Sequence, residues 1–252
     1  MKLGLVTYNM AKEWDVATII ERCEATGFQG VELRTTHAHN VEVDLSAAER
    51  RNVRSQFEDS AIELAGLGSA FEFHSPDSEE LRQNVEGTKA YSQLASDVGA
   101  PGVKVRPNGL PDEVPEQTTL EQIGISLREC GEFAKNLGVQ IRLEVHGRHT
   151  SHLPHVRTIM EIADHDNVSV CWNSNPGEVV DGSVKSNFDL VKDWIRLVHI
   201  NELHRIEYPW HELFSLLKKA KYDGYCLAEI PGNSDPERVM NYYRALWTAL
   251  CE

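Results

Sequence analysis

The sequence predicts an α/β protein, a single (β/α)8 TIM barrel that spans residues 1–252. Eight short runs rich in Val, Ile and Leu recur along the chain, and a segment with helical periodicity follows almost every one. Such alternation gives parallel strands joined by right-handed crossover helices. At 252 residues the chain has the usual size for eight strand-helix units that close into a barrel.

The expected strands follow one another at regular intervals. In order they are KLGLVTY (2–8), GVELRTT (30–36), ELAGLGS (63–69), GVKVRP (102–107), QIRLEVHG (140–147), VSVCWNS (168–174), RLVHINE (196–202) and YCLAEIPG (225–232).

Helical segments such as 15–27, 118–138 and 210–224 lie between these runs, and glycines are expected to end several helices, at Gly27, Gly99, Gly138 and Gly224. No linker divides the chain. A doubly wound open sheet is the alternative, but no Gly-x-Gly-x-x-Gly motif follows the first run.

Composition narrows the function classes. The chain is 41% hydrophobic and 25% charged, as globular proteins are, and its formal net charge of −14 disfavours a nucleic-acid partner. No apolar run is long enough to span a membrane, and the N-terminus lacks the core of a signal peptide, so we expect a cytoplasmic protein without a membrane partner. Five scattered cysteines without a Cys-x-x-Cys pair favour reduced thiols over disulfides or a thiolate zinc site.

Catalytic groups in a barrel belong at the carboxyl ends of its strands. The last four expected strands carry Glu144, Asn173, His199 and Glu229 at these ends. Closure of the sheet would bring the four within reach of one centre, and glutamate and histidine are ordinary ligands of divalent ions. The alternative is that Asn173 and Asn175 only satisfy backbone groups at the strand ends and that no metal is held.

Other polar residues at strand ends are candidates for substrate contact. Lys104 and Arg106 share one face of the fourth strand, where they either hold a phosphate or carboxylate or pair with acidic groups inside the barrel, such as Glu144 or Glu32. The full set of expected substrate-binding residues is His74, Lys104, Arg106, His146, Asn175, Glu202 and Arg205.

Four short motifs, LEVHGR, LVHINE, LAEIPG and EFHSP, occur at strand ends in the order found in one known family. The sequence resembles the xylose-isomerase-like barrels, which include sugar-phosphate isomerases and epimerases, ketose 3-epimerases and inosose dehydratases, and the resemblance covers nearly the whole chain. It implies a metal site at Glu144, position 173, His199 and Glu229. It also implies that the two glutamates transfer protons and that His74 lies in the substrate pocket.

Asn173 departs from this family, which normally has aspartate there. An amide oxygen still offers a lone pair but lacks the charge, and two carboxylates with a neutral imidazole still balance a divalent ion. We therefore expect Zn2+, Mn2+, Co2+ or Mg2+ to bind weakly, with Zn2+ and Co2+ held better on the histidine.

The predicted function is a metal-dependent isomerase or epimerase of a sugar or sugar phosphate. It would act on a small carbohydrate by proton transfer next to a carbonyl, through an enediolate, with Glu144 and Glu229 as catalytic residues. The main alternative, which Asn173 favours, is a metal-free or weakly metal-binding barrel that binds or senses carbohydrate. A dehydratase or lyase of a keto-sugar or inosose, and an apurinic endonuclease, are weaker alternatives. Whether the chain forms a homo-oligomer stays open.

Overall fold

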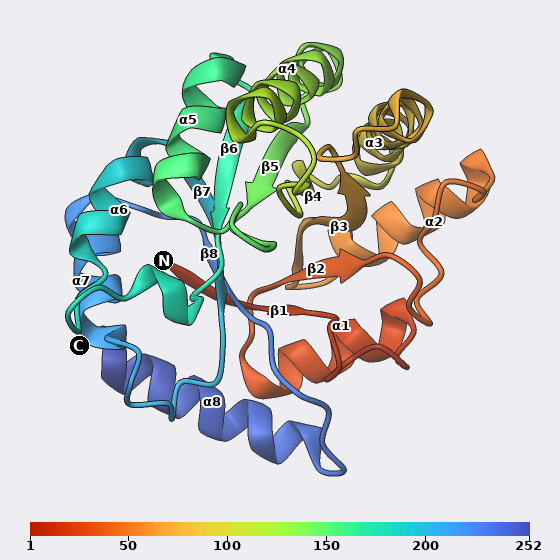
Figure 1. Cartoon of the computed structure of the whole chain (residues 1–252). Coiled ribbons are helices and arrows are strands. Elements are labelled where there is room, and N and C mark those ends of the chain that lie inside the picture. The colour runs from red at the N-terminus through yellow and green to blue at the C-terminus, as the bar shows by residue number, and fades with distance from the viewer.

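A computed structural model describes residues 1–252 and shows a closed barrel of eight parallel strands inside a ring of helices (Figure 1). The strands pair in chain order, and the last one pairs with the first, Leu3 opposite Cys226. The predicted (β/α)8 barrel is thus confirmed, and the doubly wound open sheet is excluded.

Each expected run forms a strand. The strands are β1 (Lys2–Val6), β2 (Gly30–Arg34), β3 (Glu63–Glu72), β4 (Gly102–Arg106), β5 (Gln140–Glu144), β6 (Val168–Trp172), β7 (Ile195–Ile200) and β8 (Tyr225–Ala228). The helices are α1 (Val16–Thr26), α2 (Ala47–Glu58), α3 (Ser78–Val98), α4 (Glu116–Lys135), α5 (Leu153–Ala163), α6 (Lys185–Val191), α7 (Trp210–Lys219) and α8 (Pro236–Cys251). Two short 3-10 turns, η1 (Pro176–Glu178) and η2 (Lys192–Trp194), interrupt the connections after β6 and α6.

Glycine ends two helices as predicted. Gly27 and Gly99 follow α1 and α3 in the left-handed conformation, with φ of 73° and 84°. The expectation for Gly224 is wrong, because α7 ends five residues earlier, at Lys219, and Lys221 takes the left-handed conformation there with φ of 56°.

The apolar core has two parts. The larger part fills the space between strands and helices, where Trp172 is fully buried against Phe188. The smaller part fills the interior of the barrel and includes Cys171, Leu197 and Leu227. None of the helices combines the length and apolar character that a membrane crossing requires.

Glycines on β3 make room for charged side chains inside the barrel. A Cβ atom on Gly68 would lie 2.7 Å from Oε1 of Glu32, and one on Gly66 would lie 3.1 Å from Nη1 of Arg142. Both charged residues are buried, at 1% and 6% exposure. The two glycines of β3 therefore leave space for charged side chains that β2 and β5 place inside the barrel.

Gly4 of β1 provides a stability test of strand packing. A Cβ atom there would press on the Leu227 side chain and lie 2.7 Å from the carbonyl oxygen of Gly30, which cannot move without distorting β2. We expect Gly4→Ala to lower the free energy of unfolding by about 1–3 kcal/mol in urea titrations, as overpacked cores do. Gly177→Ala is the control, because nothing lies within 4 Å of its added Cβ. An unchanged unfolding midpoint for Gly4→Ala would contradict this packing.

Candidate functional site

A polar cavity of about 300 Å³ opens at the carboxyl ends of the strands. Every strand end except that of β3 contributes to it, and only one lining residue, Tyr8, is hydrophobic. The lining consists of Tyr8, Arg34, Lys104, Arg106, Glu144, His146, Asn173, Asn175, Asn201 and Glu229. Such a lining suits a small, strongly polar molecule.

Three side chains bring metal-ligating atoms together at this cavity. Glu144, His199 and Glu229 each offer one such atom, and the three atoms lie within 4.8 Å of one another. Nδ1 of His199 is 3.6 Å from Oε1 of Glu144 and 3.9 Å from Oε2 of Glu229. Glu144 ends β5, His199 lies on β7, and Glu229 directly follows β8. Barrel closure therefore assembles the cluster from residues that are far apart in the sequence.

Asn173 lies at the same cavity with an unused oxygen. It follows β6, is 6% exposed, and its Oδ1 is buried without a hydrogen-bond partner. Both ring nitrogens of His199 also lack hydrogen bonds. Buried polar atoms are normally paired, so an amide oxygen and an imidazole without partners, beside two carboxylates, fit a bound cation. Two carboxylates, an imidazole and an amide oxygen form a suitable donor set for a divalent ion.

Lys104 forms an ion pair with one of the proposed metal ligands, Glu144. Its buried Nζ lies 2.8 Å from Oε2 of Glu144 and 3.3 Å from the carbonyl oxygen of Ser69. Of the two alternatives that the sequence left open for Lys104, the structure shows the internal pair with Glu144. Burial tends to raise the pKa of Glu144, but Lys104 and His199 outweigh it and hold that pKa below its ordinary value. Glu144 therefore stays ionised, with its second oxygen toward His199.

Glu32 of β2 lies on the other side of the histidine ring. Its Oε1 is 3.3 Å from Nε2 of His199, and both side chains are 1% exposed. Burial tends to lower the pKa of His199, but Cys171 and Glu32 outweigh it and raise that pKa well above its ordinary value. Burial also raises the pKa of Glu229, whose side chain is 19% exposed. The imidazole is thus held between carboxylates from opposite sides.

The other predicted residues in the cavity are anchored by the protein. A ring nitrogen of His146 lies 2.9 Å from Oδ1 of Asn108, and the amide of Asn175 donates to the carbonyl oxygen of Val145 at 2.6 Å. Arg106 pairs with Glu72 at 2.5 Å. Each of these three side chains faces the cavity in a fixed orientation.

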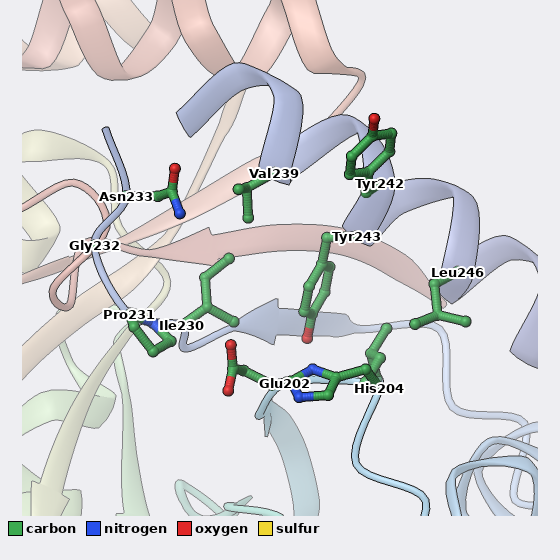
Figure 2. A pocket seen from close by; sticks show the side chains of 11 residues that line it. Glu202, His204, Ile230, Pro231, Gly232, Asn233, Val239, Tyr242, Tyr243 and Leu246 are labelled. Atoms are coloured by element: carbon green, nitrogen blue, oxygen red, sulfur yellow. The ribbon is translucent and has the colours of Figure 1, made fainter. Parts of the chain in front are cut away.

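The structure places three predicted substrate-binding residues outside this cavity. His74 packs near Gly109 and lies 3.9 Å from Glu72. Glu202 lines a different, more apolar pocket between the ends of β7 and β8 and helix α8, where Figure 2 shows it beside Ile230 and Tyr243. Arg205 is exposed and lies 3.5 Å from Glu202. After β7 it is Asn201 that faces the cavity, and the next residue turns outward.

Three lining residues were not among the predicted site residues: Tyr8, Arg34 and Asn201. Each lies two positions after a residue that faces the barrel interior, namely Val6, Glu32 and His199. Side chains alternate along a strand, so a period of two, counted from the inward-facing residues, would have found all three.

Comparisons with known proteins agree with this architecture. A family model described as a xylose isomerase-like TIM barrel matches residues 20–246. No curated protein matches the chain significantly in sequence. Among solved structures, D-psicose 3-epimerase from Clostridium cellulolyticum H10, solved with D-tagatose, is 16% identical, with a TM-score of 0.84 and 100% of both chains covered.

Two further structures are similar. The 3-keto-D-glucoside 4-epimerase YcjR from E. coli is 16% identical, with a TM-score of 0.80 and 99% of each chain covered. The IOLI protein with a bound zinc atom is 17% identical, with a TM-score of 0.79, and the match covers 99% of this chain and 96% of that one. At such identities the likeness shows the fold alone.

Glu178 holds the loop that carries Asn173 and Asn175. It is fully buried, accepts a hydrogen bond of 2.6 Å from the hydroxyl of Tyr208, and has Nδ2 of Asn175 at 3.3 Å from its Oε1. No cation pairs with it, and burial raises its pKa to about 8. The carboxyl group is therefore protonated at neutral pH. Nothing in the sequence distinguishes this glutamate from an exposed one.

This buried acid predicts a pH dependence of stability. The pKa of Glu178 is 4.5 without burial and about 8 in the folded protein, so the folded state binds more protons between these values and loses stability as the pH rises through them. One titrating proton can lower the free energy of unfolding by at most about 1.4 kcal/mol per pH unit. We expect this fall with pH to be smaller in Glu178→Gln. Urea unfolding across this range measures it, with the exposed Glu161→Gln as control. Parallel pH profiles for Glu178→Gln and the wild type would refute a protonated Glu178.

Proposed function

The chain belongs to the xylose isomerase-like TIM barrel family, and we propose that it is a metal-dependent isomerase or epimerase of a sugar or sugar phosphate. The proposed reaction moves a proton on a carbon next to a carbonyl, through an enediolate. The proposed cofactor is Zn2+, Mn2+, Co2+ or Mg2+, bound weakly because Asn173 supplies an amide where an acid would supply charge.

One observation carries this proposal more than any other. Glu144, His199 and Glu229 offer ligand atoms within 4.8 Å of one another at the base of a polar cavity, beside the unpaired Oδ1 of Asn173. These four residues would hold the ion. When bound there, the ion would polarise a substrate carbonyl and stabilise the negative charge that develops on its oxygen.

The two glutamates are the proposed proton-transfer groups. Glu144 ends β5 and Glu229 follows β8, three strand positions apart around the barrel, so their carboxylates approach the cavity from different directions. An epimerase needs a base on one face of the reacting carbon and an acid on the other. Lys104 fixes Glu144 through an ion pair at 2.8 Å, whereas no lysine or arginine pairs with Glu229.

The remaining lining groups suit a polyhydroxylated substrate. Asn175, Asn201 and His146 present amide and imidazole groups, which donate to and accept from hydroxyls. The volume of about 300 Å³ fits a small carbohydrate. Two similar structures are named as sugar epimerases and a third holds zinc, which supports the same class of reaction.

A second function, a carbohydrate-binding barrel without metal, is favoured by the pair of Lys104 and Glu144. Their contact at 2.8 Å already neutralises one proposed ligand. The side chain of Asn173 is a neutral amide and contributes no charge to the set of metal ligands. Tight binding of a sugar without turnover, in the presence of added Zn2+, Mn2+ and Co2+, would select this alternative.

Replacement of the bases tests the proposed reaction. Glu144→Gln and Glu229→Gln keep the shape and an oxygen but cannot accept a proton, so turnover is expected to fall about a hundredfold or more. The measurement is incorporation of deuterium from heavy water at the carbon next to the carbonyl of candidate ketoses. Glu202→Gln is the control, because Glu202 lies at the same end of the barrel but outside the cavity.

Equal deuterium incorporation in the wild type and both cavity variants would exclude these glutamates as the bases. Because Glu144→Gln leaves Lys104 buried without its partner, circular dichroism must show that the variant is folded. Glu229→Gln breaks no such pair and serves as the independent variant.

A further inference from the structure

Positive charge gathers on one side of the cavity. Arg34 ends β2, and Lys104 and Arg106 lie on β4, whereas the proposed ligands come from β5 to β8. The strand between these cations contributes Gly68, which pairs in register with both Arg34 and Lys104 and has no side chain to separate them. Positively charged side chains therefore lie toward one wall of the cavity, and the proposed metal ligands lie toward the other.

Two of the three cations are neutralised by the protein. Lys104 lies 2.8 Å from Glu144, and Arg106 lies 2.5 Å from Glu72. The guanidinium of Arg34 has no carboxylate within ion-pair distance and donates no hydrogen bond. The guanidinium carbon lies 5.6 Å from the centroid of the Tyr8 ring, at cation–π distance.

The surroundings of Arg34 fix its backbone and leave its charge free. Its amide nitrogen donates to Oγ1 of Thr7 at 2.9 Å, and its carbonyl oxygen lies 2.8 Å from Nε2 of His39. The neighbouring His37 stays neutral, because burial and the charge of Arg34 lower its pKa to about 4. An arginine in a polar cavity without a counter-ion is suited to bind an anionic group by paired hydrogen bonds.

We propose that Arg34 binds an anionic group of the substrate, a carboxylate or a phosphate, at the end of the sugar remote from the reacting carbonyl. β2 and β6 lie four positions apart in the eight-stranded barrel, so Arg34 and Asn173 face each other across the cavity. The substrate then lies across the barrel, with its anion at Arg34 and its carbonyl among the proposed ligands. This inference rests on the proposed function only for the position of the substrate carbonyl.

Three ketoses that differ only at carbon 6 test the proposal: D-fructose, its 6-phosphate, and D-fructuronate, which has a carboxylate there. Isothermal titration calorimetry with the purified chain is expected to show that at least one anionic ketose binds about tenfold or more tightly than D-fructose. Whichever of the two binds better identifies the anion. The measurement needs no turnover.

Variants of Arg34 separate the local contact from overall charge. Arg34→Met should abolish the preference for the anionic ketose, and Arg34→Lys should keep part of it, because lysine has the charge without the planar fork. Arg205→Met removes the same charge from an exposed site outside the cavity and should leave the preference unchanged. A preference that survives Arg34→Met, or equal or absent binding of all three ketoses by the wild type, would overturn the proposal.

The outcomes also separate this proposal from the proposed function. If a neutral ketose incorporates deuterium and the anionic ketoses bind no more tightly, the proposed isomerase or epimerase reaction stands and the proposed role of Arg34 is rejected. Binding of an anionic ketose through Arg34 without deuterium incorporation by any ketose keeps the anion site and rejects the proposed reaction.

Discussion

The buried imidazole of His199 is the centre on which the candidate site depends. Glu32 lies 3.3 Å from one ring nitrogen, and Glu144 and Glu229 lie 3.6 and 3.9 Å from the other. Charges in a medium of low polarity interact strongly and are costly without partners, so these side chains constrain one another. The three carboxylates come from β2, β5 and β8, and only a closed barrel places them around one ring.

The rest of the barrel interior accommodates this group of charges. Lys104 neutralises Glu144 from β4, and the glycines of β3 leave the space that Glu32 and Arg142 occupy. The apolar inner core closes the barrel beneath, and the polar cavity opens above. These buried charges are costly without partners. They form the base of a site in which a bound cation and a polar substrate would supply the missing partners.

The fold could be predicted because its signals are local. Each strand is a short apolar run, and alternation along it decides which residues face inward, as for Glu144 and His199. Other features depend on contacts that the sequence does not show. Glu178 reads as a polar turn residue until Tyr208 is seen to cover it. Glu202 reads as a strand-end acid, but the chain turns after Asn201 and directs it toward α8.

Asn173, with Glu144, His199 and Glu229, is the proposed site for a divalent ion, and calorimetric titration of Mn2+ into the wild type and Asn173→Asp is the sharpest test of it. The added charge should tighten binding by about 2–3 kcal/mol, roughly thirty- to a hundred-and-fiftyfold. Asn201→Asp adds the same charge elsewhere in the cavity and should change the affinity much less. Equal Mn2+ affinities for the wild type and Asn173→Asp would contradict the claim.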